Sequence, residues 1–444
     1  MKTPICDFVS EYNSKNPLRF HMPGHKGKSF LGIESLDITE ITGADVLYNA
    51  NGIIRQSEEN ASSLFSSRLT LYSAEGTSLS IRATLLMLKK YAEQSGKKPL
   101  ILAGRNAHKT FITAAAILNI DVEWIFSQEN IITSNIDGKL LEKRIKEVKP
   151  TAVYLTSPDY LGNILDIKAL SRITEKYGVT LVVDNAHGAY LKFFDKSLHP
   201  IDSGADICFD SAHKTLPVLT GGAYLHIADK APLFFSIEAE NALSAFASTS
   251  PSYLILQSLD KANNYLENDI KNDLKRVSKA ITELKTKLKN NGYSFIGNEP
   301  LKLTISAKEY GYLGTYLAKE LEKENIFCEF CDPDFLTFMF SPFTEDSELL
   351  KLEKALLRFK KCQKITEKPP CVKPLKKALS LSEAFFGKSK KTDVKFCENK
   401  ILAMPSINCP PAVSIAVCGE RIDASAISCM DYYGIDYCYI LDEE

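Results

Sequence analysis

Short apolar runs alternate with helical patterns between about residues 68 and 227. The six runs cover residues 69–72, 99–103, 152–155, 180–183, 206–209 and 222–227. Helical patterns follow the first two runs, over about residues 78–91 and from about residue 107. Because the runs are apolar throughout, they are typical of strands in a parallel sheet that helices cover on both faces. The pattern predicts an α/β domain with a mostly parallel sheet.

The pattern changes near residue 253. Residues 253–290 are rich in Leu, Lys, Asp and Glu with helical periodicity, and Asn290-Asn291-Gly292 is a stop signal. Residues 293–361 then predict a strand, a helix, two strands and a helix, which together make a small α+β unit.

Residues 361–377 are basic and include Pro369-Pro370, a composition typical of a linker. We therefore expect three parts. Residues 1–290 would form a major domain with an N-terminal segment, residues 291–365 a small α+β domain, and residues 366–444 the linker and a C-terminal domain.

Composition narrows the class of protein. The chain has 444 residues, of which 45% are hydrophobic, and a formal net charge of -1 at pH 7. This balance gives no hint of nucleic acid or an anionic membrane as a partner. No apolar run approaches the roughly 20 residues that span a bilayer, and the first residues lack the apolar core of a signal peptide. We expect a cytoplasmic protein.

The 11 cysteines are irregularly spaced. Cys328 and Cys331 form the only C-x-x-C in the sequence, and neither a second pair nor a nearby histidine pair completes a zinc site. We expect mostly buried, reduced cysteines and no metal.

Two strand ends carry the most informative residues. Asp184 ends the 180–183 run, and Lys214 follows the 206–209 run. Ligands of open α/β sheets lie beyond the carboxyl ends of the strands. A lysine there can form a Schiff base with pyridoxal phosphate, and an aspartate can keep the pyridinium nitrogen protonated, so that the ring accepts electrons. Alone, Lys214 could be a surface lysine and Asp184 a helix cap; the two residues together predict this cofactor.

Other polar residues at strand ends suit the same cofactor. Glu75-Gly76-Thr77-Ser78 lies between a strand and a helix and could bind a phosphate, although a helix cap without a ligand has the same composition. His108 follows the second run, where it could lie against an aromatic ring or on the surface. Residues 248–253 contain a hydroxyl cluster, which is either a plain loop or a contact to a neighbouring subunit's phosphate.

Histidines beside these motifs add candidate chemistry. His213 is adjacent to Lys214 and could donate a proton, while Ser211 could add a phosphate contact. His21 and His25 flank a turn near the N-terminus, which is either a flexible loop or a lid near the substrate.

Together these motifs resemble the Orn/Lys/Arg decarboxylases, in their short form, over nearly the whole chain. The motifs, in order, are His21-Met22-Pro23-Gly24-His25-Lys26, Thr39-Glu40-Ile41, Asn51-Gly52-Ile53-Ile54, Arg105-Asn106-Ala107-His108-Lys109, Asp184-Asn185-Ala186-His187-Gly188, Ser211-Ala212-His213-Lys214-Thr215-Leu216-Pro217, Thr249-Ser250-Pro251-Ser252-Tyr253, Pro410-Pro411 and Gly419-Glu420-Arg421-Ile422. The resemblance implies a fold-type I, pyridoxal-phosphate-dependent transferase-like large domain, a small α+β domain and a C-terminal decarboxylase domain.

The resemblance also implies roles for single residues. Lys214, His213 and Asp184 would be catalytic. The cofactor would be bound by Thr77, Ser78, His108, Asp184, Ala186, His187, Ser211, Lys214 and, across a dimer, Ser248. His108 would stack on the ring and Ala186 would pack on its other face.

Several positions depart from the family's usual residues, and they put the substrate in doubt. They are Arg55-Gln56, Glu75, Asn185, Gly221-Gly222 and Cys409-Pro410-Pro411-Ala412. The glycine pair removes bulk close after Lys214, which could leave room for a guanidinium group. Glu75 and Glu420 are weak candidates for the carboxylate that a cationic side chain needs.

The resemblance therefore predicts a lyase that decarboxylates arginine, or else lysine or ornithine, and yields a polyamine or its precursor. A homodimer or a larger assembly of dimers is expected, with a small-molecule substrate. Two alternatives stay open: another reaction on the same fold, such as transamination or aldol cleavage, or a catalytically silent protein that binds pyridoxal phosphate.

Overall fold

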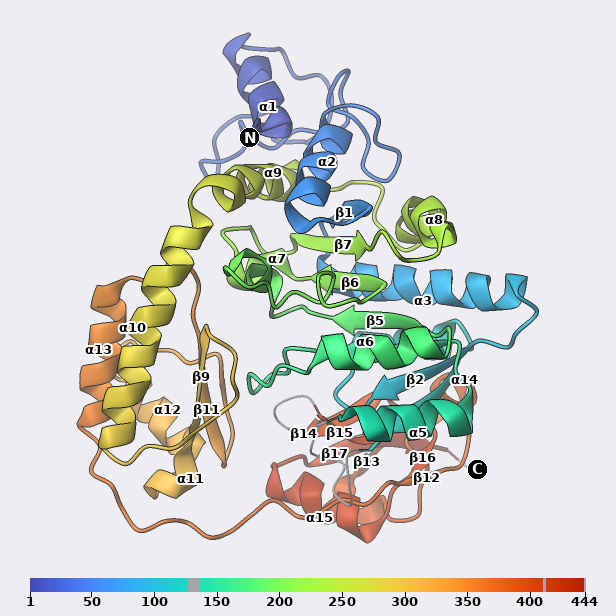
Figure 1. Ribbon diagram of the computed structural model, residues 1–444, viewed down its shortest axis with the longest axis vertical. Coiled ribbons are helices and arrows are strands. Elements are labelled where there is room, and N and C mark those ends of the chain that lie inside the picture. The colour runs from blue at the N-terminus through green and yellow to red at the C-terminus, as the bar shows by residue number, and fades with distance from the viewer. Residues whose placement is uncertain (127–135, 410–412, 443–444) are drawn as a thin grey trace. The chain divides into compact units, whose positions relative to one another are not determined.

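The computed structural model describes residues 1–126, 136–409 and 413–442 (Figure 1). Pro410 and Pro411 of the C-terminal motif lie outside the described residues. The chain divides into two compact units, the first made of Met1–Gly96 and Thr180–Leu274 and the second of Lys97–Val179 and Lys275–Glu444. The expected boundaries near residues 290 and 365 do not coincide with this division, and the three-part organisation stays a prediction.

The first unit contributes four strands to the central sheet, in the order β1-β7-β6-β5. β5 and β6 are parallel, whereas β7 is antiparallel to both β6 and β1. β1, β5 and β6 therefore end at one edge, and β7 begins there. The elements of this unit are α1 (Pro4–Ser14), α2 (Ile53–Phe65), β1 (Leu69–Ser73), α3 (Gly76–Gln94), β5 (Thr180–Asp184), η1 (Ala189–Phe193), β6 (Ile207–Asp210), α7 (Ala212–Thr215), β7 (Ala223–Ile227), α8 (Leu233–Ser244), α9 (Tyr253–Asn268) and the start of α10 (Ile270–Asn290).

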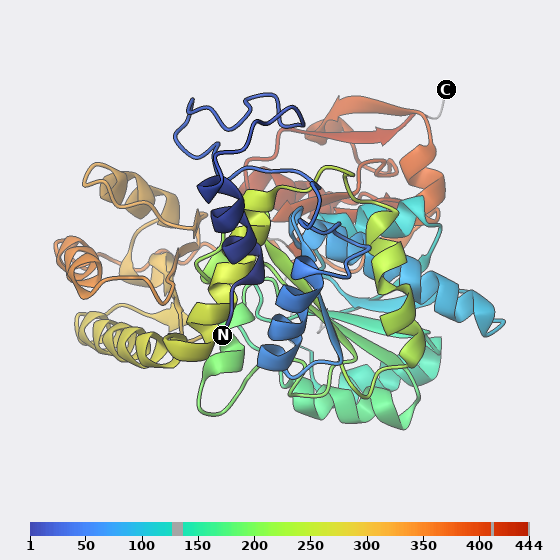
Figure 2. The same cartoon turned by 90° about the horizontal axis from the view of Figure 1, so that it is seen from above.

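Helix α1 packs against α2 and α9 (Figure 2). Its N-cap residue, Thr3, makes no side-chain capping bond. Instead, Oδ2 of Asp260 on α9 accepts hydrogen bonds from the backbone N–H groups of Ile5 and Cys6, each at 3.0 Å. Oδ1 of Asp260 accepts from Ser57 Oγ at 2.6 Å. One buried carboxylate thus joins α1, α2 and α9 by meeting the unpaired donors at a helix start.

The second unit contributes β4, β2 and β3, in that order, and β2 is parallel to both β4 and β3. A smaller antiparallel sheet has the order β10-β11-β9-β8. The elements are β2 (Leu100–Gly104), α4 (Lys109–Ile117), β3 (Asp121–Ile125), α5 (Gly138–Val148), β4 (Ala152–Thr156), α6 (Ile167–Lys176), β8 (Phe295–Ile296), β9 (Lys302–Ser306), α11 (Ala307–Tyr310), α12 (Gly314–Glu322), β10 (Phe330–Cys331), β11 (Phe335–Met339) and α13 (Asp346–Leu357).

The C-terminal segment has short elements around a small core. They are β12 (Lys376–Lys377), α14 (Leu381–Phe386), β13 (Ser389–Asp393), η2 (Val394–Phe396), β14 (Ser406–Cys409), β15 (Val413–Val417), β16 (Glu420–Arg421), α15 (Ala424–Tyr432) and β17 (Tyr437–Leu441). Residues of these elements form one buried apolar cluster with Val372 and Leu375, which precede them, and with Cys397, Leu402 and Ile422 from the segments between them.

The α/β fold and its mostly parallel, seven-stranded sheet confirm the predicted fold class. The six predicted strands are present, and the helical stretch after residue 253 is α9 and α10. β3 was not predicted, and the small α+β unit has additional short elements around β8 and α11. In the described residues, no helix combines the length and apolarity that crossing a membrane requires; the cytoplasmic location stays a prediction.

Candidate active site

One edge of the first unit's sheet collects most of the candidate residues. The loop after β1 leads to Thr77, Asp184 ends β5, Ser211 follows β6, and Gly222 precedes β7. Because β1, β5 and β6 end at this edge while β7 begins there, residues from three distant parts of the sequence lie along it. Such an edge is where open α/β sheets bind their ligands.

Asp184 ends β5, and Lys214 follows the neighbouring parallel strand, β6. Lys214 lies on α7, half-buried, and its Nζ is 2.8 Å from Nε2 of His187. Asp184 is buried, and its Oδ1 accepts a hydrogen bond from the backbone N–H of Ala186 at 3.2 Å. A lysine amine and a buried carboxylate are thus both held at the same end of the sheet, one by an imidazole and the other by the turn that follows β5.

The start of α3 offers hydrogen-bond donors for an anion. Thr77 Oγ1 and Ser211 Oγ are 3.0 Å apart. Gly76 has a φ of +69°, a left-handed conformation that glycine adopts without strain. The N-cap residue, Glu75, makes no side-chain capping bond. Two hydroxyls beside a helix N-terminus therefore form the kind of site that binds phosphate.

His213 is fixed by the turn before β7. Both its backbone N–H and its Nδ1 lie within hydrogen-bond distance of the Gly222 carbonyl oxygen, at 3.1 and 2.9 Å. A carbonyl only accepts, so Nδ1 carries the hydrogen and Nε2 of the neutral ring is an acceptor. Burial, with a further contribution from the Lys214 charge, lowers the pKa of His213 below its ordinary value. A neutral imidazole able to take up a proton is expected near pH 7.

Glu75 and Ser248 form a contact that the sequence did not reveal. The backbone N–H of Ser248 donates to Glu75 Oε1 at 2.7 Å, and Ser248 Oγ accepts from the N–H of Ser250 at 3.1 Å. Glu75 thus joins the α8–α9 loop to the loop before α3. This departure from the family pattern has a structural explanation, and Glu75 is a poor candidate for a substrate-binding carboxylate.

The glycine pair before β7 is required by backbone packing. Gly221 has a φ of +102°, and a Cβ there would lie 2.9 Å from the Ala74 carbonyl oxygen. A Cβ on Gly222 would lie 2.3 Å from a methyl carbon of Val218. Gly221 also accepts a hydrogen bond from the Gly76 N–H at 2.7 Å. Gly221 lets the loop before β7 approach the loop after β1, and Gly222 leaves room for Val218; this packing accounts for the glycine pair and removes the support it gave to a guanidinium site.

His108, in the second unit, lies exposed at the start of α4. Its Nδ1 accepts a hydrogen bond from the Thr110 N–H at 3.2 Å, so the imidazole acts as the cap of this helix. This contact fixes the ring, but its stacking on a cofactor stays a prediction.

Arg105 and Glu420 form a buried ion pair within the second unit. Arg105 Nη1 and Nη2 donate to Glu420 Oε1 and Oε2 at 2.8 and 2.6 Å, and Arg105 Nε donates to the Ser414 carbonyl at 2.9 Å. The N–H of Val417 also donates to Glu420 Oε2. Both carboxylate oxygens of Glu420 are therefore engaged, which argues against its binding a substrate cation.

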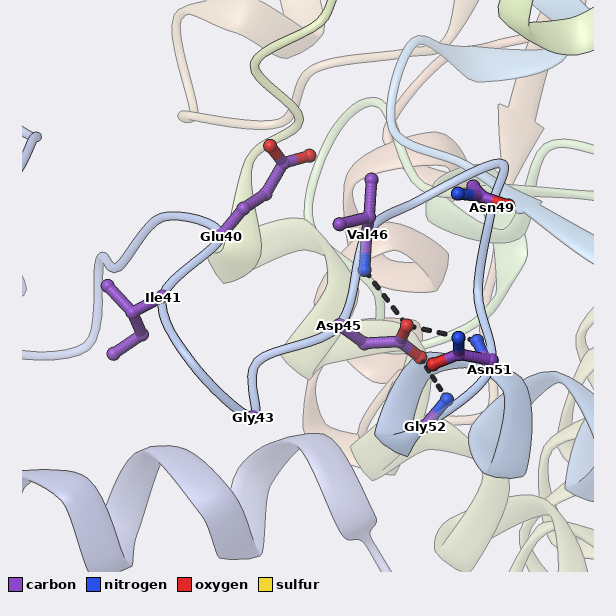
Figure 3. A pocket seen from close by; sticks show the side chains of 8 residues that line it. All are labelled: Glu40, Ile41, Gly43, Asp45, Val46, Asn49, Asn51 and Gly52. Atoms are coloured by element: carbon purple, nitrogen blue, oxygen red, sulfur yellow. Dashed lines mark hydrogen bonds between the residues drawn. The ribbon is translucent and has the colours of Figure 1, made fainter.

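A pocket of about 300 Å³ lies in the N-terminal segment of the first unit (Figure 3). It is lined by Glu40, Ile41, Gly43, Asp45, Val46, Asn49, Asn51 and Gly52. The Asp45 carboxylate accepts hydrogen bonds from the backbone N–H groups of Val46, Asn51 and Gly52 at 2.9, 3.0 and 2.8 Å. Asp45 thus shapes the loop before α2 instead of presenting its charge to a ligand.

The two N-terminal histidines are held by neighbouring side chains. His21 Nε2 is 2.7 Å from Tyr12 Oη, and His25 Nε2 is 3.1 Å from Asp37 Oδ2. These contacts order the segment locally, and its role as a lid stays a prediction.

Comparison with known proteins identifies the family. The sequence model of the protein family described as "Orn/Lys/Arg decarboxylase, major domain" matches residues 3–298 of this chain. Uncharacterized protein YaaO of Bacillus subtilis (strain 168) is 30% identical over 357 residues, which covers 75% of this chain and 72% of YaaO. The arginine decarboxylase of the same organism is 28% identical over 465 aligned residues, which covers 96% and 92% of the two chains.

Solved structures share the fold. The Francisella novicida lysine decarboxylase LdcF matches with a TM-score of 0.82 and 18% identity, over 99% of this chain and 81% of that chain. A NifS-like protein matches with a TM-score of 0.56 and 15% identity, over 69% and 86%. The chain therefore has the fold of the fold-type I enzymes that use pyridoxal phosphate. Within that class, it belongs to the Orn/Lys/Arg decarboxylase family.

Proposed function

We propose that this protein is a pyridoxal-phosphate-dependent decarboxylase of a basic amino acid, with arginine ranked before lysine and ornithine. The observation that carries the proposal is the placement of Lys214 and Asp184 after adjacent parallel strands, at the edge that also holds the hydroxyls of Thr77 and Ser211. When bound, the cofactor supplies an electron sink for the bond between the α-carbon and its carboxylate.

The residues at this edge fit the chemical groups of the cofactor. The start of α3, with the Thr77 and Ser211 hydroxyls, suits the phosphate. The buried carboxylate of Asp184 suits a protonated ring nitrogen. The Lys214 amine suits the aldehyde carbon. Ser78, Ala186 and His187 would complete the site, and Ser248 would contribute from the partner subunit.

Three side chains would hold or move protons. His187 Nε2 accepts a hydrogen bond from the Lys214 amine and holds it in place. After CO2 has left, Lys214, or His213 once its Nε2 has taken up a proton, would return a proton to the α-carbon. Bond alignment and charge stabilisation would supply most of the rate acceleration.

Arginine ranks first because several relatives that align over most of this chain are named arginine decarboxylase. The solved lysine decarboxylases are less similar in sequence. The polyamine precursor agmatine would then be the product.

A homodimer would complete the site. Several large apolar side chains of the N-terminal segment are exposed, with Phe20 at 92%, Phe30 at 89% and Leu18 at 83%. Such a concentration of exposed apolar side chains marks an interaction surface, and a second copy of this chain is the partner that we propose.

The test measures CO2 release by the purified chain, supplied with pyridoxal phosphate, from arginine, lysine and ornithine, with glutamate as control. Release from a basic amino acid alone is the expected result. Release from none of them would favour the silent cofactor-binding alternative, and amino transfer to a keto acid would favour a transaminase.

A further inference from the structure

A buried carboxylate lies at the end of β6, one residue before Ser211. Both oxygens of Asp210 are engaged: Oδ1 accepts from Asn185 Nδ2 at 2.7 Å, and Oδ2 lies 3.0 Å from His199 Nε2 and 3.2 Å from His226 Nε2. All four side chains are fully buried. We call these four residues the Asp210 network.

Hydrogen-bond partners show which ring nitrogens carry hydrogen. The backbone N–H of Ile201 donates to His199 Nδ1 at 3.4 Å, so Nε2 of His199 carries the hydrogen and donates to Asp210. His226 Nδ1 lies 2.8 Å from Thr70 Oγ1, which can donate to it, and Nε2 of His226 then also donates to Asp210. Asp210 is the common acceptor of three N–H groups.

The pKa of the Asp210 carboxyl agrees with this arrangement of hydrogen bonds. Burial raises the pKa of Asp210, but the interactions with His199, followed by those with His226, outweigh burial and hold this pKa well below its usual range. Burial lowers the pKa of His226. His199, Cys208 and Asp210 also place possible metal-ligand atoms within 4.8 Å of one another. With its hydrogen on Nε2, His199 has a lone pair on Nδ1 alone, and that lone pair accepts from the Ile201 N–H, so the hydrogen-bonded network accounts for the cluster.

The network fixes the orientation of Asn185 at a cost. Asn185 Oδ1 is buried and has no hydrogen-bond partner among the described residues. Turning the amide over would place two acceptors, Oδ1 and the Asp210 carboxylate, against each other. A buried acceptor without a donor is unfavourable, so the Asn185–Asp210 bond is kept despite that cost.

This bond connects the two strand ends that carry the candidate cofactor residues. The Asn185 backbone N–H donates to the Phe209 carbonyl at 3.1 Å, and Phe209 is the register partner of Asp184. We propose that Asp210 is a positioning residue, which acts through Asn185 to hold Asp184 in register with Ser211 and the Lys214 turn. The inference rests on the proposed function, because it assigns Asp184 and Ser211 to the cofactor.

Two variants test the bond in opposite ways. Asn185→Asp places two carboxylates 2.7 Å apart where one hydrogen bond now stands. The double variant N185D/D210N exchanges the two groups. The amide introduced at position 210 can donate to the carboxylate introduced at position 185, while its oxygen still accepts from His199 and His226. The double variant therefore preserves every bond of the network.

The first readout is the dissociation constant of pyridoxal phosphate from the full chain, measured by fluorescence quenching of the apoprotein. The second is the thermal midpoint of the apoprotein. We expect N185D to weaken cofactor binding by roughly tenfold or more and N185D/D210N to restore it to within about threefold, as coupled neighbours behave.

Asp260→Asn is the matched control. It replaces a buried aspartate by asparagine, as D210N does, but this aspartate anchors α1. It should lower the thermal midpoint and leave the dissociation constant unchanged. If N185D fails to fold, the double variant decides the question by comparison with Asn185→Leu, which cannot bond to Asp210. Cofactor binding by the double variant as tight as in the parent supports the inference. Binding as weak as in Asn185→Leu overturns it.

The outcomes separate the inference from the proposed function. If the parent and the N185D variant bind the cofactor equally well, the inference is overturned and the proposed function is not. A double variant with a restored thermal midpoint but weak cofactor binding also overturns it. A parent chain that binds no pyridoxal phosphate overturns the proposed function and this inference together.

Discussion

Lys214 Nζ lies 2.8 Å from His187 Nε2, although the two residues are 27 positions apart in the sequence. A protonated lysine can only donate this bond, and His187 then accepts it at an unprotonated Nε2. Because His187 follows β5 and Lys214 follows β6, the contact links the turns after two parallel strands. It places the amine at the sheet edge where a cofactor aldehyde would arrive.

Lys214→Ala should abolish covalent attachment of pyridoxal phosphate. Borohydride reduction of the parent should give a stable adduct that peptide mass spectrometry maps to Lys214, because its amine lies at the sheet edge just after β6. Lys109→Ala, which changes an exposed lysine, is the control and should keep the adduct. An adduct that persists in Lys214→Ala would refute the assignment.

Asp184→Ala should lower turnover by roughly two orders of magnitude or more, in the range seen when a charge-stabilising group is removed from an active site. Without the carboxylate the ring nitrogen would lose its proton. The kinetics should be measured beside circular dichroism, to show that the fold is retained. Near-parent turnover in a folded variant would contradict the role of Asp184.

Glu420→Gln should destabilise the protein by about 3–5 kcal/mol, because it leaves the buried Arg105 guanidinium without its counter-charge. Urea unfolding measures this change. Glu367→Gln is the control, since Glu367 is exposed and lies 3.7 Å from Lys308, and it should change stability by less than about 1 kcal/mol. A raised KM for arginine with parent-like stability in Glu420→Gln would instead make Glu420 a substrate ligand.

Phe20→Glu combined with Phe30→Glu should shift the protein from dimer to monomer, because charges on the exposed N-terminal segment oppose burial of that surface. Light scattering measures the mass. Phe327→Glu, at a side chain 72% exposed in the second unit, should leave the dimer intact. A parent chain that is an active monomer would rule out the shared site.

The sequence predicted the strands that are apolar on both faces but missed β3. In Asp121–Ile125, the half-exposed Asp121 and Glu123 alternate with the buried Val122 and Trp124. This is the pattern of an edge strand, and a search for continuous apolar runs passes over it.

The gathering of most candidate residues at one sheet edge was predictable, because each ends a strand or follows one within a few positions; their roles stay predictions. The Asp210 network was not, although an acidic residue at the end of an apolar run was a usable signal. Its partners come from residues 185, 199 and 226, and their meeting depends on strand register. The Glu75–Ser248 and Arg105–Glu420 contacts were missed for the same reason, since each joins residues more than 170 positions apart.

The amines formed from equal concentrations of arginine, lysine and ornithine test the central claim most directly. The purified chain is supplied with pyridoxal phosphate, Lys214→Ala serves as the blank, and agmatine, cadaverine and putrescine are quantified together with CO2. We predict agmatine in the largest amount, in a one-to-one ratio with CO2, and no product from the blank. Preferential release of cadaverine or putrescine would contradict the substrate ranking, and the absence of all three amines would contradict the decarboxylase itself.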